Sequence, residues 1–163
     1  MTVSLVIQRI TEDDSTPGDD AFNEWVETAL RSDHYGQATQ YSITIRLVDE
    51  EESRQLNCNY RGRDSATNVL SFPADLPALI QSELESDSGT TLLGDLVICV
   101  PVVKHEAQEQ GKPLLNHWTH LVIHGVLHLL GHDHADSKQA ESMEQLEKDM
   151  LATLGINDPY LVS

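Results

Sequence analysis

The sequence of 163 residues contains only two cysteines, Cys58 and Cys99, and they lack CxxC spacing. No disulfide framework is expected, and we predict two reduced thiols with packing roles, in line with a reducing compartment. No apolar run approaches the roughly 20 residues of a membrane span. The N-terminus has no basic start and no small-residue cleavage site. These absences predict a soluble cytoplasmic protein without a membrane partner.

Basic residues are scarce, because ten Lys and Arg stand against 27 Asp and Glu, which gives a net charge of −17. This balance argues against a sequence-independent nucleic-acid binder, since such proteins usually carry a basic face. Three of the ten basic residues, Arg54, Arg61 and Arg63, nevertheless fall within ten positions. The sequence therefore allows a local basic spot on an otherwise acidic, solvated surface.

The length and the 39% hydrophobic content fit one compact domain spanning residues 1–163. Apolar periodicity predicts strands and helices. The expected strands are 3–10, 41–48, 68–72 and 93–100, and the expected helices are 22–30, 49–56, 101–111, 117–130 and one from 136 onward. Two prolines, acidic residues and SDSG predict an acidic loop over about 73–92. The order of elements indicates an α+β or α/β domain with about four strands.

The stretch HLVIHGVLHLLGHDH, residues 120–134, contains five of the eight histidines. His124 and His128 stand one helical turn apart on the same face, where one cation can bind both imidazoles. A third ligand further along the helix would lie about 15 Å away. Gly131 can end the helix in a left-handed conformation and turn the chain back. We therefore expect His134 to return to the metal.

The pattern His-x3-His-x2-Gly-x2-His predicts one divalent cation, preferably zinc, bound by His124, His128 and His134. An open fourth position is typical of a catalytic site. His132 competes with His134 as the third ligand. For His120 a packing or surface role is preferred, and a fourth ligand or a supporting group is the alternative. Core histidines without a metal are the alternative for the helical pair.

Gly125 distinguishes this pattern from the metzincin protease motif H-E-x-x-H-x-x-G-x-x-H, in which a general-base Glu occupies that position. Without the base, peptide hydrolysis loses the group that deprotonates water. A metalloprotease is therefore a weaker alternative. A cation and an arginine can instead stabilise the anion that develops when water attacks a phosphodiester, so we favour that reaction.

Three segments, YRGRDSATNVLSFP, LLGDLVIC and HGVLHLLGHDH, resemble the YbeY family of endoribonucleases, the bacterial rRNA maturation factors. The similarity runs from about Leu56 to Met150. It implies a single α+β domain with a mixed sheet packed with helices, and a zinc site on a central helix and the turn after it. It also implies cleavage of single-stranded RNA, with roles in 16S rRNA 3′-end processing and ribosome quality control. RNA and the ribosome or its proteins are the implied partners, without a small-molecule cofactor.

In this resemblance the three zinc histidines of the family correspond to His124, His128 and His134, and its functionally important arginine corresponds to Arg61. We expect Arg61 to bind a phosphate bidentately, which a lysine could not reproduce. A structural salt bridge is the alternative for this arginine. One departure is His132, where the family usually has Tyr. The alternative function is a ribosome-assembly factor that binds without cleaving and whose zinc is structural.

Overall fold

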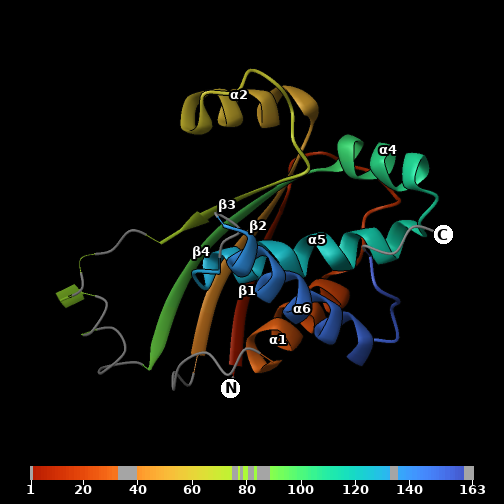
Figure 1. Ribbon diagram of the computed structural model, residues 1–163. Helices are drawn as coiled ribbons and strands as arrows, with labels where there is room; N and C mark the ends of the chain where they lie inside the picture. The colour runs from red at the N-terminus through yellow and green to blue at the C-terminus, as the bar shows by residue number, and fades with distance from the viewer. Residues whose placement is uncertain are drawn as a thin grey trace.

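The structure, a computed structural model, describes residues 2–32, 40–74, 77, 79–80, 83, 89–132 and 136–159 (Figure 1). In chain order the elements are β1 (Thr2–Arg9), α1 (Asp19–Ser32), β2 (Gln40–Val48), α2 (Glu50–Arg61), β3 (Val69–Pro73), β4 (Thr90–Cys99), α4 (Val100–Gln110), α5 (Leu114–Leu129) and α6 (Ser137–Thr153).

The strands form one mixed sheet in the order β1-β2-β4-β3. β1, β2 and β4 are parallel, and β3 runs antiparallel to β4 at one edge. Parallel neighbours need a crossover connection, and α1 lies in the connection between β1 and β2. The expected fold class, a single compact α+β domain with a mixed sheet of about four strands, is confirmed.

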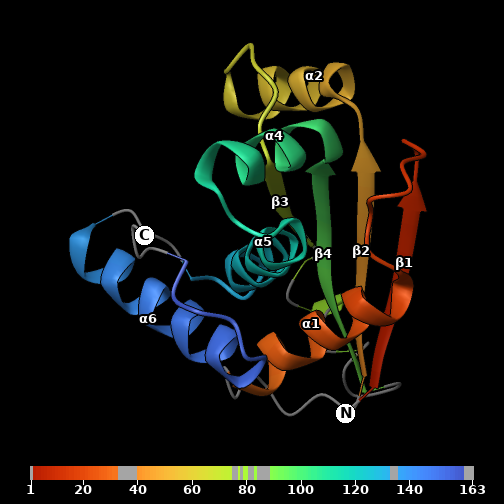
Figure 2. The ribbon, with the colours of Figure 1, turned by 90° about the vertical axis from the view of Figure 1, so that its right-hand side faces the viewer.

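Helices α1 and α5 cover one face of the sheet, and α6 packs outside α5 (Figure 2). The aromatic rings of Phe22 on α1 and Trp118 on α5 are both 0% exposed and meet edge to face, with centroids 5.8 Å apart. Most residues of α5 are buried. This helix is therefore held on several sides, which makes it a rigid support for its histidines.

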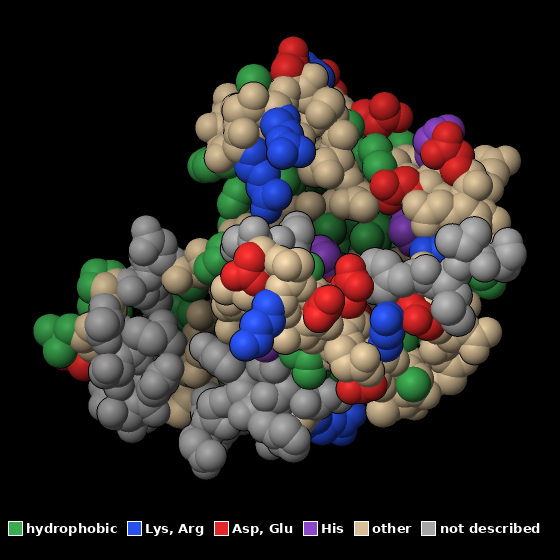
Figure 3. All heavy atoms as spheres, viewed as in Figure 1, with side chains coloured by type: hydrophobic (Ala, Val, Ile, Leu, Met, Phe, Trp, Pro, Cys, Tyr) green, Lys and Arg blue, Asp and Glu red, His purple; other side chains and the backbone are tan. Residues whose placement is uncertain are grey.

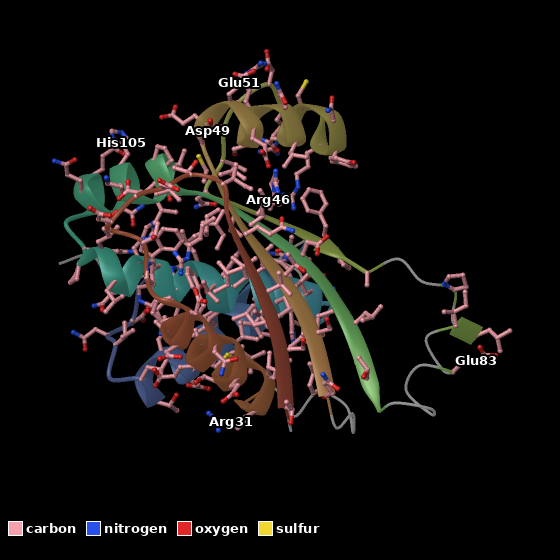
Figure 4. All side chains as sticks on the ribbon, turned by 180° about the vertical axis from the view of Figure 1, so that it is seen from behind. Arg31, Arg46, Asp49, Glu51, Glu83 and His105 are labelled. Carbon is pink, nitrogen blue, oxygen red and sulfur yellow. The ribbon has the colours of Figure 1, made fainter. Side chains whose placement is uncertain are left out.

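Helix α2 packs at the other face of the sheet. Its Leu56 joins a small apolar cluster with Val48, Leu70, Val97 and Cys99. Arg46 follows Ile45 on β2 and so points to the face opposite the main core. Its guanidinium donates to both carboxylate oxygens of Glu52 on α2, with Nη2 3.0 Å from Oε1. Figure 4 shows Arg46 beneath α2. This bidentate pair fastens α2 to the sheet.

Helix α2 is longer than expected. The Asp49 side chain accepts a hydrogen bond from the Glu52 amide at 3.0 Å, which confirms the predicted helix start. The helix then continues to Arg61 instead of ending near Leu56. The apolar periodicity that predicts the helix stops early because polar side chains occupy the buried positions of α2. One of them, Asn57, donates to the Ser65 carbonyl at 2.8 Å and holds the following turn against the helix.

Two other boundaries differ from the prediction. Helix α5 begins at Leu114 directly after Pro113, three residues before the expected start at 117, and no side chain caps it. Pro113 is the N-cap residue, and its backbone carbonyl accepts the first hydrogen bond of the helix, from the His117 amide at 3.1 Å. Strand β4 begins at Thr90, and its first residues pair with β2 although they belonged to the expected acidic loop. The register shifts between Ser42 and Ile43 on β2, where the pairing passes from Leu92 to Gly94 of β4.

Both cysteines are free thiols, as predicted. Cys99 is buried, and burial raises the pKa of its thiol. Cys58 is exposed, so the packing role expected for it is wrong. Within the described ranges no helix combines the length and the apolar character that a bilayer crossing requires.

Candidate metal centre

Helix α5 carries a row of histidines, His117, His120, His124 and His128, at spacings of three and four residues. Residues at these spacings share one face of a helix. The rings of neighbours in the row lie 6.4, 6.1 and 4.6 Å apart between centroids. The row therefore places imidazoles beside one another along the helix, and the shortest step is between His124 and His128.

His124 and His128 point toward a common position. Their Nε2 atoms are 3.1 Å apart. Two nitrogen ligands of the same tetrahedral zinc ion, each 2.0–2.1 Å from it, lie about 3.3 Å apart. The spacing and the donor type of the two imidazoles therefore fit one divalent cation. That these residues hold a metal stays a prediction.

Helix α6 contributes an acidic group that the sequence reasoning missed. The Glu147 side chain is 0% exposed. Its Oε2 lies 3.2 Å from His120 Nε2, and its Oε1 makes a short hydrogen bond with His124 Nδ1. One potential ligand atom from each of these three residues lies within 4.8 Å of the others. They form a second group that could hold a cation, and it shares His124 with the first.

The sequence does contain a signal for Glu147. The predicted last helix has an apolar stripe that includes Ala140, Met143 and Met150. Glu147 stands four residues after Met143 and seven after Ala140, which is a position of the stripe itself. An acidic residue in the buried stripe of an amphipathic helix needs partners in the core. For Glu147 the histidines of α5 are such partners.

The end of α5 has the conformation that the glycine predicted. Gly131 has φ +98°, its amide donates to the His128 carbonyl at 3.1 Å, and the His132 amide donates to the Leu127 carbonyl at 3.0 Å. This pair of bonds is the Schellman motif, which ends a helix and reverses the chain. His134 lies outside the described residues, so its role as the third ligand stays a prediction.

Arg61 is the last residue of α2 and is exposed. Among the residues that the structure describes it makes no hydrogen bond or ion pair, so the salt bridge considered for it is not seen there. By contrast, Arg54 pairs with Glu51 and Asp64, and these carboxylates raise the pKa of its guanidinium. Figure 3 shows Lys and Arg side chains at α2 above a hollow in which hydrophobic and histidine side chains are visible.

A partly buried polar cluster connects α4 to His117, the first histidine of the row on α5. Asn68 and His117 both contact Glu106, with 3.0 Å from Asn68 Nδ2 and from His117 Nε2 to Oε1. Burial alone would raise the pKa of the Glu106 carboxyl, but the bonds to His117 and Asn68 outweigh it and the pKa is lowered. Glu106 therefore stabilises the fold as a carboxylate.

Comparison with known proteins identifies the family. The sequence model described as Endoribonuclease YbeY matches residues 8–155. The chain belongs to the YbeY endoribonuclease family. A Pseudomonas entomophila protein named Endoribonuclease YbeY is 54% identical over 158 residues, which cover 97% of this chain and 93% of that protein. A Xanthomonas axonopodis protein of the same name is 54% identical over 140 residues, or 86% of this chain and 82% of that protein.

A solved structure supports the fold of this YbeY family member. The solution structure of TM1509 from Thermotoga maritima matches with a TM-score of 0.54 and 22% sequence identity. The match covers 98% of this chain and 99% of the other. At this identity the likeness concerns the fold alone.

The protease alternative finds no support in this YbeY family member. Gly125 is buried on α5, and a Cβ at this position would lie 2.8 Å from Leu96 Cδ2 and 3.4 Å from Val69 Cγ2. Position 125 therefore faces the sheet. A carboxylate placed there would enter the core and could not serve as the base of a metzincin site.

Three further polar residues lie on or near the strands β3 and β4. Asp64 pairs with Arg54, and Asn68 donates to Glu106, so both side chains have partners within the fold. Asp95 is exposed in the wall of a pocket of about 380 Å³, together with Thr44 and Phe72.

Proposed function

We propose that this protein is a metal-dependent endoribonuclease that hydrolyses single-stranded RNA. Its proposed role is rRNA maturation at the 16S 3′ end and ribosome quality control in the bacterial cytoplasm. The observation that carries the proposal is the facing pair of Nε2 atoms of His124 and His128, 3.1 Å apart on a buried helix. Membership of the YbeY family, whose relatives are named endoribonucleases, supports the RNA substrate.

His124 and His128 would hold one zinc ion, with His134 as the third ligand. A cation bound there supplies positive charge beside a scissile phosphate and lowers the pKa of a water molecule. The burial of α5 keeps both rings in place, so little reorganisation is needed when substrate binds. Preorganisation of this kind is the contribution that the fold makes to the reaction.

Arg61 would bind the phosphate. Its guanidinium is exposed at the end of α2, and the bond from Asn57 to Ser65 holds the turn beside it. A planar guanidinium can donate two parallel hydrogen bonds to phosphate oxygens. On a protein of net charge −17 such a specific contact matters more than the overall field, which repels RNA.

The test combines elemental analysis with RNA cleavage. Wild type is compared with His128→Ala and Arg61→Ala on a single-stranded RNA oligonucleotide, with each protein purified away from host nucleases. We expect one zinc per chain and cleavage in wild type, zinc without cleavage in Arg61→Ala, and neither in His128→Ala. Cleavage by Arg61→Ala at the wild-type rate would remove the phosphate role.

A ribosome-assembly factor with a structural zinc is the second candidate, and the acidity favours it, because an acidic surface fits basic ribosomal proteins. This candidate predicts that chelation unfolds the protein and that metal-loaded wild type leaves RNA intact. The endoribonuclease predicts the opposite pair of results. Circular dichroism with and without a chelator, alongside the cleavage assay, separates the two.

A further inference from the structure

Glu147 is a carboxylate in the protein interior between two imidazoles. Its side chain is 0% exposed, whereas the His120 and His124 side chains are 12% and 26% exposed. A carboxylate in such surroundings is costly unless hydrogen bonds compensate it. Both of its oxygens have a ring nitrogen as partner, Oε2 with His120 Nε2 and Oε1 with His124 Nδ1. The carboxylate is therefore matched to imidazole donors on α5.

The contact with His124 determines where that ring carries its proton. An ionised carboxylate only accepts hydrogen bonds, so the nitrogen facing it must carry the hydrogen. In a neutral imidazole the other nitrogen then has the only lone pair. For His124 that nitrogen is Nε2, which faces His128 Nε2 at 3.1 Å. The bond to Glu147 thus prepares the ring for a cation on the side of His128.

We infer that Glu147 is a positioning residue of the metal centre, which fixes His124 in the tautomer that offers Nε2 to the cation and keeps His120 out of the ligand set. The inference rests on the proposed function for the identity of the site. Carboxylates that accept the second N–H of a metal-bound histidine orient the ring and raise its basicity.

The rival arrangement places a cation among His120, His124 and Glu147, whose ligand atoms lie within 4.8 Å of one another, and it needs the other tautomer of His124. It would require Nδ1 of His124 as the ligand atom, and a neutral ring cannot then also offer Nε2 on the side of His128. A cation in contact with the fully buried Glu147 would also lie beneath the surface, because His120 is only 12% exposed. Such a site suits a structural metal rather than one that meets RNA.

Zinc affinity separates the two arrangements. Metal-free wild type, Glu147→Gln, His120→Asn and His128→Ala are titrated with zinc against a chromophoric chelator, without RNA. The matched control is Glu141→Gln, an exposed carboxylate on the same helix. We expect Glu147→Gln to bind one zinc about 10–100-fold more weakly. The control and His120→Asn should stay within a few-fold of wild type, and His128→Ala should lose the site. One zinc retained by His128→Ala but lost from Glu147→Gln and His120→Asn would overturn the assignment.

A second measurement does not depend on how a variant folds. Nitrogen-15 NMR of the zinc-loaded wild type reports which ring nitrogen of His124 carries hydrogen. We expect a protonated Nδ1 and a metal-bound Nε2, and the reverse would refute the positioning role. Neither experiment uses RNA. A protein that binds zinc in this way but leaves RNA intact would therefore contradict the proposed function and not this inference.

Discussion

The main chain of Gly94 on β4 passes directly against the Phe72 carbonyl on β3. A Cβ at position 94 would lie 2.1 Å from that oxygen and 2.8 Å from the Ala74 amide nitrogen. Gly94 also has φ +128°, a conformation that residues with a side chain rarely adopt. The pairing of Pro73 with Gly94 therefore depends on glycine, and with it the edge of the sheet beside Asp95.

Gly94→Ala should destabilise the fold by about 3 kcal/mol or more, because backbone strain and a steric clash with rigid main-chain atoms add together. Urea unfolding followed by circular dichroism measures the change. Gly111→Ala is the matched control, since Gly111 has φ +63° but no heavy atom within 4 Å of the added Cβ. Gly111→Ala should lower the free energy of unfolding by only about 1 kcal/mol. Equal losses in the two variants would show that the close approach is unimportant.

Arg61→Ala should lower kcat/KM for single-stranded RNA by about 100-fold, a typical loss when one donor to a developing anion is removed. The slope of log affinity against log salt should decrease in magnitude by about 0.7, the value for one phosphate contact on a single strand. Arg61→Lys should keep the slope but recover little of the rate, because it lacks the bidentate geometry.

The control for this series is Arg31→Ala. Arg31 is exposed at the end of α1, at the opposite end of the molecule from α2 (Figure 4). Removing it changes the net charge by the same amount as Arg61→Ala. If both alanine variants lose activity equally, general electrostatics and not a specific contact explains the effect.

Glu106→Gln should lower the free energy of unfolding by about 1–2 kcal/mol at pH 7, because hydrogen bonds to a carboxylate are replaced by weaker ones. The folded-state pKa of Glu106 lies below the ordinary value of 4.5, so the folded protein resists protonation more than the unfolded chain does. This contribution is present above about pH 4.5 and disappears as the pH falls through the folded-state value. The free energies of unfolding of wild type and Glu106→Gln should therefore converge at acidic pH.

Denaturant titrations between pH 3 and pH 8 measure this convergence. Glu109→Gln is the matched control, since Glu109 lies on the same helix and is 65% exposed beside His105. The free energy of unfolding of Glu109→Gln should equal that of wild type at all pH values. If the loss in free energy of unfolding caused by Glu106→Gln stays constant down to pH 3, the ionised carboxylate does not have this role.

The sequence predicted those helix starts and ends that are specified by residues close to them in the chain. The sequence predicted the start of α2 at Asp49, a start of α6 near Asp136 and the end of α5 at Gly131, and local hydrogen bonds are found at all three helix ends. These signals work because they depend on residues close together in the chain.

What the sequence did not predict depends on contacts between distant segments. The extension of α2 to Arg61 relies on Ser53 and Asn57, whose polar side chains are buried because they bind the backbone of the next turn. The first residues of β4 pair with β2 across a register shift that no local pattern specifies. Glu147 meets His124 only when α6 folds back on α5, 23 positions later in the chain.

A zinc titration of RNA cleavage tests most directly whether one cation at His124 and His128 carries the reaction. Metal-free protein receives zinc in fractions of an equivalent, and the initial rate on a single-stranded RNA is recorded at each step. The rate should rise in proportion to zinc up to one equivalent and then level off, with no rise for His128→Ala. A metal-free protein that cleaves at the full rate, or a His128→Ala variant that responds as wild type does, would contradict the account.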